Sequence, residues 1–414
     1  MIGRIKEMMK DELVRGSMVL VISIVIFNLF NYAFQISMAK MLGPADFGVL
    51  AALMSIIYIL NIPGEAIQTV VSKYTSKFVS QNKIGKIKEL MIRSGKKGFK
   101  FAVISFVILC ILSILLSEII KIELWLLILT GVFAFYIFLV PIGRGILQGQ
   151  KRFLGFGLNL IFESCIKVLV SILLVFAGWR VYGAIAGVLI SSACAFFIIF
   201  AMLKKVVKSE REQESFDGLY KGSMPVLAAI TAIVLMYSID ILIAKAVFDP
   251  EVAGQYAFIS LIGKVIIFVS SSIGRAMLPL SSEKHEKGID TQRLFQKSLL
   301  LVTAISVVIL LFYYALPEFI VYLVSLGSDK YVEASHILFR LGAAYAMLSI
   351  ANIIILYKIS VNKIRKSAFV LIIFAVIQAL LLIYYKQSLD SFANAFLVSN
   401  ILLFVYSLFV SFKK

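Results

Sequence analysis

The stretch AKMLGPADFGVL, Ala39–Leu50, places a Gly-Pro-Ala-Asp-Phe-Gly break between two long apolar runs. A second stretch, AKAVFDPEVAGQY at Ala244–Tyr256, repeats this pattern about half a chain later. With one inserted residue, Pro44 aligns with Pro250 and Gly48 with Gly254. Because Gly and Pro together mark turns, the pattern predicts two matching halves, each with a tight turn between its first two apolar runs.

The composition indicates a chain that resides in a membrane. Hydrophobic residues make up 61% of the 414 residues and charged residues only 15%, whereas soluble domains have about 45–50% apolar residues. Crossing a bilayer core of roughly 30 Å takes about 20 apolar helical residues, and runs of this length recur along the whole chain. We therefore predict an all-α integral membrane protein without a soluble domain.

Twelve spans are predicted from apolar runs that Gly, Pro or charged residues separate. The first six cover roughly 14–40, 45–72, 99–117, 123–147, 153–177 and 181–203, and the second six roughly 222–247, 251–281, 294–315, 332–358, 365–385 and 389–411.

Lys and Arg residues concentrate in every second segment between the predicted spans. The chain has 41 Lys and Arg against 23 Asp and Glu, and the segments that hold several of them fall on one side of the predicted spans. Cytosolic loops collect such residues, so we predict a multi-pass protein of the plasma membrane with both termini in the cytosol. The net charge of +18 then reflects topology and not nucleic-acid binding. The dense basic segment Lys73–Lys100 either contacts anionic lipid headgroups or is a solvated loop.

Six spans per half return the chain to its starting side, so the two halves share one orientation. Parallel repeats of this kind are typical of secondary transporters, which place a site between two lobes. The predicted lobes are residues 1–210 and 211–414, arranged around a central cavity.

Polar side chains within the spans should face a cavity or a partner, because a charge at the centre of a spanning helix costs about 2.5–3.5 kcal/mol on insertion scales. Asn28, Asn31 and Gln35 lie on one stripe of the first span, and Gln68 belongs to a similar stripe on the second. These four side chains are predicted to line an aqueous cleft.

Two acidic residues and a predicted helix bend are further candidates for the site. Glu65 and Asp240 are the carboxyl groups most suited to coupling with Na⁺ or H⁺, because burial favours the protonated form. Whether the chain is coupled to an ion at all stays open. Pro63 and Gly64 are predicted to form a hinge, because proline removes a helix hydrogen bond and glycine lacks a side chain.

The span at 153–177 carries Asn159, Glu163, Lys167 and Ser171 at intervals of four. Glu163 followed by Lys167 is the favourable order for an ion pair along a helix. We expect this pair to act as a structural lock within the first lobe, with contact to a substrate or a proton as the alternative.

The segments MAKMLGPADFGVLAALMSI (38–56) and PIGRGILQGQKRF (141–153), together with the two six-helix halves, resemble the polysaccharide and oligosaccharide flippases. These belong to the multidrug/oligosaccharidyl-lipid/polysaccharide (MOP) exporter superfamily. The resemblance implies a MATE-like transporter that flips an isoprenoid-diphosphate-linked glycan from the cytosolic to the outer leaflet by alternating access.

A diphosphate needs cationic donors, and three basic residues are candidates for substrate binding. Lys264 lies near the middle of its predicted span, and its alternative role is to neutralise Asp240 or Glu65. Arg275 lies nearer the cytosol and could instead extend its charge to the interface. Arg340 has anchoring at the outer interface as its alternative.

Two other classes of function compete with the flippase. A multidrug or cation exporter of the same superfamily would favour an acidic, aromatic cavity. A multispanning glycan polymerase or ligase would need larger outer loops than these, of which the longest is near Pro317–Tyr331. The three cysteines and two histidines show no metal-ligand spacing, so neither a cofactor nor a metal is expected, and the oligomeric state is left open.

Overall fold

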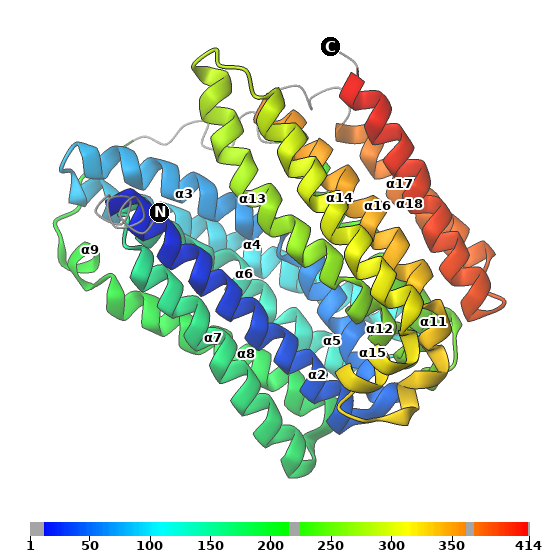
Figure 1. Ribbon diagram of the computed structural model, residues 1–414. Coiled ribbons are helices and arrows are strands. Elements are labelled where there is room, and N and C mark those ends of the chain that lie inside the picture. The colour runs from blue at the N-terminus through cyan, green and yellow to red at the C-terminus, as the bar shows by residue number, and fades with distance from the viewer. Residues whose placement is uncertain (1–11, 215–223, 362–367, 413–414) are drawn as a thin grey trace. The chain divides into compact units, whose positions relative to one another are not determined.

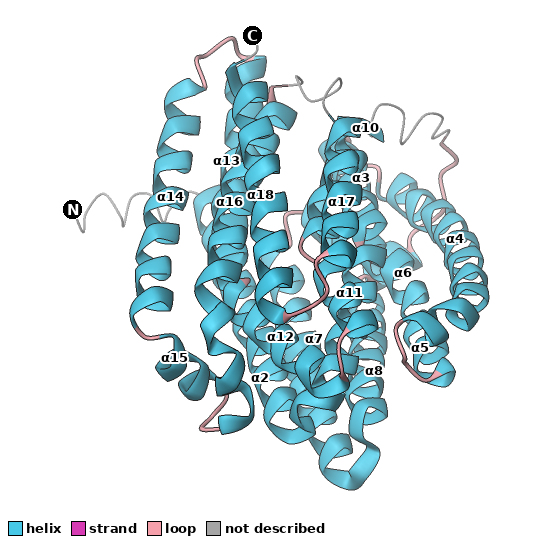
Figure 2. Cartoon of the chain, turned by 90° about the vertical axis from the view of Figure 1, so that its right-hand side faces the viewer, coloured by secondary structure: helices cyan, strands magenta, loops and turns pink. Residues whose placement is uncertain are grey.

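The computed structural model describes residues 12–214, 224–361 and 368–412, and every regular element in these ranges is helical (Figures 1 and 2). In this part of the chain, nine helical stretches are long and apolar enough to cross a membrane. Two of them, Met18–Ser80 and Phe153–Met202, each contain two predicted spans, and Ala368–Tyr384 is a shorter apolar helix. The helices thus confirm the all-α membrane fold and are consistent with twelve crossings.

Apolar side chains cover the outer faces of these helices. In α4 (Ile84–Ile119), the exposed residues Phe101, Ile104, Ile108, Ile111 and Leu115 follow one another at helical spacing. Ile111 is 64% exposed. A continuous apolar stripe of this kind would be unfavourable in water and is suited to contact with lipid tails.

The chain divides into two compact units. Unit 1 comprises Met1–Leu42 and Leu60–Lys221, and unit 2 comprises Gly43–Ile59 and Gly222–Lys414. This division differs from the continuous lobes 1–210 and 211–414, because the segment that follows the first break packs with the second half of the chain.

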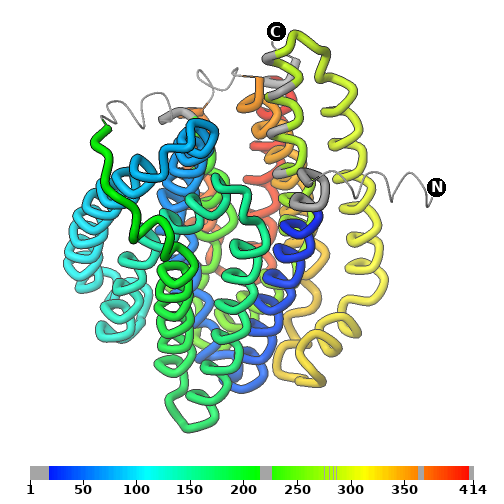
Figure 3. The backbone as a smooth tube through the Cα atoms, turned by 90° about the vertical axis from the view of Figure 1, so that its left-hand side faces the viewer, coloured from blue at the N-terminus to red at the C-terminus, as the bar shows by residue number. Residues whose placement is uncertain are grey.

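Unit 1 is built from helix pairs joined by short turns, and α7 and α8 form one such antiparallel pair (Figure 3). Its helices are the first part of α2 (Glu12–Leu60), α3 (Ile62–Ser80), α4, α5 (Leu124–Gly131), α6 (Phe133–Gly149), α7 (Phe153–Leu174), the π-helix η1 (Val175–Trp179), α8 (Arg180–Met202) and α9 (Lys204–Lys208).

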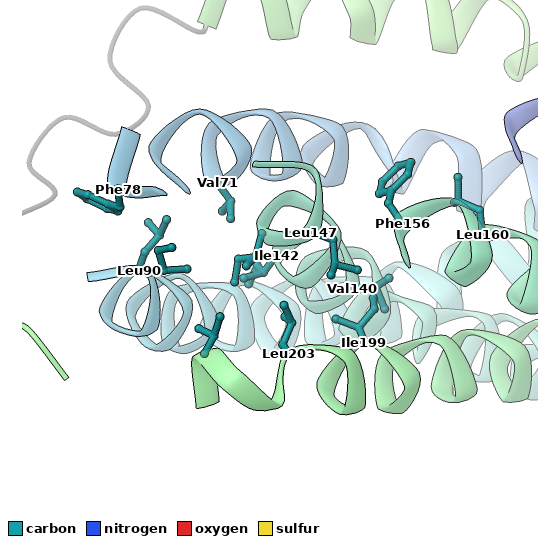
Figure 4. Close-up of a cluster of buried hydrophobic side chains, with 13 residues drawn as sticks. Val71, Phe78, Leu90, Val140, Ile142, Leu147, Phe156, Leu160, Ile199 and Leu203 are labelled. Carbon is teal, nitrogen blue, oxygen red and sulfur yellow. The ribbon is translucent and has the colours of Figure 1, made fainter. Parts of the chain in front are cut away.

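The core of unit 1 gathers aliphatic and aromatic side chains around α6 (Figure 4). Ile146 and Leu147 of α6 are fully buried between Val71 of α3, Leu90 of α4 and Leu203 after α8. Gly145 and Gly149 bring the α6 backbone close to α3, because a Cβ at either position would lie within 2.7 Å of an α3 carbonyl oxygen. This close packing fixes α6, which carries polar residues of the site described below.

The segment after α9 is bound to the first turns of α4 by charged groups. Glu89 is fully buried and accepts hydrogen bonds from Arg211 and, at 2.5 Å, from Arg93. Lys86 pairs with Glu214, and Lys88 donates to the carbonyl of Ser209 at 2.7 Å. Since 36 residues extend about 54 Å at roughly 1.5 Å per residue, α4 is longer than a bilayer core, and these first turns lie outside the predicted span 99–117.

Glu89→Gln is expected to lower the thermal-unfolding midpoint of the protein at neutral pH. The hydrogen bond from Arg211, followed by that from Arg93, lowers the pKa of Glu89 to about 2. A lowered folded-state pKa stabilises the protein above the ordinary value of 4.5, and this contribution is lost as the pH falls through about 2. The difference between wild type and variant should therefore be constant above pH 5 and shrink toward pH 2. A constant difference across that range would contradict this account of Glu89.

Unit 2 contains the remaining helices. They are the second part of α2, α10 (Met224–Met236), α11 (Ile239–Val247), α12 (Pro250–Gly263), α13 (Val265–Glu286), α14 (Gln292–Ala315), α15 (Pro317–Val324), the 3₁₀ helix η2 (Asp329–Ile337), α16 (Leu338–Ser360), α17 (Ala368–Tyr384) and α18 (Leu389–Phe412). The predicted outer loop at 317–331 is therefore largely helical.

The break in the opening stretch is confirmed at Gly43. Its backbone angles are φ 74° and ψ 173°, which interrupt α2 and which only glycine adopts at little cost. Pro44 then begins the continuing helix, as Pro250 begins α12. Both prolines occupy the first turn, where the missing N–H costs no helix bond.

The two copies of the repeat pack directly on each other within unit 2. A Cβ on Gly48 would lie 3.0 Å from the Gly254 Cα, and a Cβ on Gly254 would lie 1.7 Å from the Pro44 carbonyl oxygen. Beside this backbone contact, the Phe47 ring lies 5.9 Å from Phe258, in an edge-to-face arrangement. The paired glycines therefore permit two helices to cross with their backbones in contact.

Candidate functional site

Two neighbouring helices of unit 2 are interrupted within predicted spans. The first break lies between α10 and α11, at Tyr237 and Ser238. The second is a local disruption between α12 and α13 at Lys264, whose N–H still donates to the Ser260 carbonyl at 2.9 Å and whose carbonyl accepts from Phe268 at 3.1 Å. A break leaves backbone carbonyls without helix partners. Here Gln378 donates to the Met236 carbonyl at 2.8 Å and Tyr313 donates to the Ile262 carbonyl at 2.7 Å. Buried side chains thus satisfy a backbone carbonyl at each position, so tertiary contacts stabilise both irregularities of the helices.

Asp240 lies in the first turn of α11, directly after the first break, and is fully buried. Its Oδ2 accepts hydrogen bonds from Tyr345 at 2.8 Å, Ser260 at 3.1 Å and Tyr256 at 3.2 Å. Charge-assisted bonds of this kind stabilise a buried carboxylate. Within the described part of the chain, its other oxygen, Oδ1, has no hydrogen-bond partner.

Lys264 occupies the second break and is 5% exposed. Its Nζ lies 3.9 Å from Asp240 Oδ1 and 5.7 Å from the centre of the Tyr345 ring. The 3.9 Å separation of Nζ from Oδ1 corresponds to an ion pair but is too long for a hydrogen bond. The carboxylate compensates the charge of the lysine, while the ammonium donors remain available to another acceptor.

Unit 1 contains a second polar network, centred on Glu163 of α7. Arg144 of α6 pairs with Glu163 and donates to Asn159 at 2.8 Å, and Ser192 of α8 donates to Glu163 at 3.0 Å. Lys167 donates to Asn31 of α2. Glu163 and Lys167 thus interact only at longer range, and Arg144 from the neighbouring helix makes the close ion pair with the carboxylate. A lock within the first half is present, but it joins α6, α7 and α8.

The other polar residues of the first half do not form one group. Asn28 is exposed, whereas Gln35 is buried. Gln68 donates to Gln148 at 3.1 Å, and Glu65 is exposed. Their roles in binding or ion coupling stay predictions.

The predicted hinge coincides with a helix boundary. α2 ends at Leu60 and α3 begins at Ile62, so Pro63 lies in the first turn of α3. A Cβ on Gly64 would lie 2.9 Å from the Ile137 carbonyl oxygen, so this glycine also permits α3 and α6 to approach. Motion at the boundary stays a prediction.

The two remaining basic candidates have different outcomes. Arg340 pairs with Asp390, which also lies 3.4 Å from His336 Nε2. Asp390 is half exposed, so this arrangement agrees with the anchoring alternative. Arg275 lies in α13, but its side chain is outside the described part of the structure. Among the described residues, no cluster of three or more His, Cys, Asp or Glu side chains is suited to holding a metal ion.

Sequence reasoning missed two parts of the site. It did not identify Tyr256 and Tyr345 as partners of Asp240, since a tyrosine in an apolar helix gives no sign of its distant contacts. It also did not identify Arg144 as the partner of Glu163. The break at Lys264 had one local signal, Gly263, where a Cβ would lie 2.8 Å from the Tyr345 ring.

The comparisons identify the family. The family model described as "Polysaccharide biosynthesis protein" matches residues 37–336, more than half of the chain. No match was found among curated proteins. The chain belongs to this polysaccharide biosynthesis family, as its resemblance to the flippases predicts.

Solved structures share its fold. A multidrug resistance MATE family transporter of the MOP superfamily, in an inward-facing conformation, matches with a TM-score of 0.74 and 14% identity, covering 94% of this chain and 97% of the other. The lipid II flippase MurJ matches with a TM-score of 0.73 and 15% identity, and the match covers 95% of this chain and 87% of MurJ. The MATE multidrug transporter DinF-BH matches with a TM-score of 0.66 and 15% identity, and the match covers 97% of each chain. The MATE-like fold is thus confirmed, and all three are named as transporters or flippases and not as enzymes.

Proposed function

We propose that this chain moves an isoprenoid-diphosphate-linked oligosaccharide or polysaccharide precursor from the cytosolic to the outer leaflet of the plasma membrane. It does so by alternating access between its two lobes, without catalysing a covalent reaction. The family match supports a role in polysaccharide biosynthesis, and the fold shared with MurJ and the MATE transporters supports transport. Both termini lie in the cytosol, as the distribution of basic residues predicts.

The observation that carries the proposal is the buried Lys264 at a local disruption between α12 and α13, beside the break that precedes Asp240. Discontinuous helices and buried charges mark substrate and ion sites in transporters. Lys264 keeps ammonium donors available because its distance to Asp240 Oδ1, 3.9 Å, exceeds that of a hydrogen bond. A phosphate oxygen would accept those donors and form charge-assisted bonds. Asp240 would then compensate the lysine between transport cycles.

Export of drugs or other cations is the second candidate function, because two of the three similar structures above are multidrug transporters. A cationic drug would be attracted to Asp240 and repelled by Lys264. Coupling of either transport process to Na⁺ or H⁺ through Asp240 or Glu65 belongs to the same proposal.

A strain without this protein is expected to accumulate a lipid-linked glycan precursor on the cytosolic side of its membrane. The precursor is measured by lipid mass spectrometry, and its sidedness by accessibility to a glycosidase in intact cells and in lysed cells. Expression of the wild-type protein should remove the accumulation. Unchanged glycolipids, combined with increased sensitivity to cationic dyes, would contradict the flippase and support the exporter.

A further inference from the structure

Unit 1 holds a buried lysine whose partner is neutral. Lys167 of α7 is 8% exposed and donates a hydrogen bond to the amide oxygen of Asn31 in α2. Its Nζ also lies 4.9 Å from the centre of the Phe34 ring, within the range of a cation–π interaction. The Asn31 amide nitrogen donates to the Phe27 carbonyl at 2.7 Å, which fixes the amide oxygen toward the lysine.

The charges around Lys167 do not balance. Glu163 is the nearest acid along α7, but its carboxylate is bound by Arg144 and Ser192. Within the described residues, no carboxylate oxygen lies within 4.0 Å of Lys167 Nζ. Arg144, Glu163 and Lys167 together leave one positive charge inside unit 1. Glu163 attracts Lys167 at longer range but also pairs with Arg144, so it compensates the lysine only in part. Uncompensated buried charge is costly, so this position favours an anion.

Lys167 and Lys264, two of the buried lysines in the described part of the chain, therefore differ in their partners. Lys264 lies beside the carboxylate of Asp240, whereas Lys167 lies beside an amide and an aromatic ring. If Lys167 only fastened α7 to α2, a carboxylate at position 31 would fasten it better. An amide holds the ammonium in place without neutralising it, which leaves its charge for an incoming ligand.

We propose that Lys167, oriented by Asn31, is an anion subsite that binds a phosphate group of the diphosphate-linked substrate. This inference rests on the proposed function. The flexible stem of lysine lets the ammonium exchange the neutral amide oxygen for a charged phosphate oxygen, and the charge-assisted bond is the stronger of the two. Asn31 then returns the lysine to its resting position after the substrate leaves.

Geranylgeranyl diphosphate is the probe for this subsite, and geranylgeraniol is its uncharged control. Binding to the detergent-solubilised full chain is measured by calorimetry or by the shift of the thermal-unfolding midpoint. Wild type should bind the diphosphate at least about 10-fold more tightly than the alcohol, which corresponds to about 1.4 kcal/mol. Lys167→Gln should lose most of this preference, and Lys167→Arg should keep it. The exposed Lys96→Gln, which also removes one positive charge, should bind like wild type.

Asn31→Asp separates the anion subsite from a structural lock. The variant keeps the lysine and supplies a carboxylate at the same position, so the probe-free protein should unfold at the same temperature as wild type or higher. It should nevertheless lose diphosphate binding by about 10-fold. Wild-type binding in both Asn31→Asp and Lys167→Gln would overturn the subsite while leaving the proposed function intact. A wild type that does not distinguish the diphosphate from the alcohol would overturn both.

Discussion

Lys264→Ala is expected to reduce translocation of the lipid-linked glycan at least about 100-fold, equivalent to roughly 2.7 kcal/mol of transition-state stabilisation. The residue is a buried cation of unit 2, and its ammonium lies 3.9 Å from Asp240 Oδ1, beyond hydrogen-bond distance. Removing it leaves the carboxylate near the three hydroxyl groups that already bind it. Removing one partner of a buried ion pair costs about 3–5 kcal/mol, and these hydroxyl groups should keep the loss of stability near the lower end of that range. Transport is measured with the reconstituted protein, and stability by thermal unfolding.

A double variant distinguishes loss of function from loss of folding. Lys264→Met combined with Asp240→Asn removes both charges while keeping similar side-chain volumes, and such replacements of a buried pair are often neutral or stabilising. We expect it to unfold at a temperature close to that of wild type and still fail to transport. Normal transport by this variant would show that the pair is structural only. Lys264→Arg, which preserves the charge, should retain part of the activity.

Gly254→Ala is expected to cause the largest loss of stability among single methyl additions in the described chain. Its Cβ would lie 1.7 Å from the Pro44 carbonyl oxygen, and this obstacle is backbone that no side-chain rotation can move. Overpacking of a tight contact costs about 1–3 kcal/mol and occasionally more. Gly48→Ala should be milder, because its Cβ would meet Gly254 atoms at 3.0 Å. Thermal unfolding of the purified variants measures this difference, and the midpoint of Gly254→Ala should be lower than that of Gly48→Ala.

Gly95→Ala is the matched control, since this α4 glycine has no neighbouring atom within 4 Å of its added Cβ. Alanine is about 1 kcal/mol better than glycine in a helix, so the control should be as stable as wild type or more stable. Equal midpoints for Gly254→Ala and Gly95→Ala would contradict the close backbone contact between the two repeats.

The fold was predictable because its main determinants are local. Runs of about 20 apolar residues predict helices that span a membrane, and the Gly-Pro breaks predict where one helix passes to the next. The grouping of Gly43–Ile59 with unit 2 was not predictable. It depends on the contact of Gly48 with Gly254, and glycine spacing alone does not specify which backbone approaches it.

The site was predictable only in part. Helical spacing and the cost of intramembrane charge selected Lys264 and Asp240 as site candidates and gave their pairing as one alternative, which the 3.9 Å separation confirms. Helical spacing did not identify the close ion-pair partner of Glu163, because the i,i+4 rule considers only neighbours on one helix. Arg144 reaches Glu163 from another helix. Partners such as Tyr345, 105 residues from Asp240 in the sequence, depend on tertiary packing and leave no periodic signal.

The most direct measurement is translocation of a fluorescent polyprenyl-diphosphate oligosaccharide by the purified protein in proteoliposomes, followed by accessibility of the glycan to a membrane-impermeant oxidant. The account predicts rapid translocation by wild type and the background rate of protein-free vesicles for Lys264→Ala. Wild-type translocation at that background rate, under conditions in which the same vesicles transport a cationic dye, would contradict it.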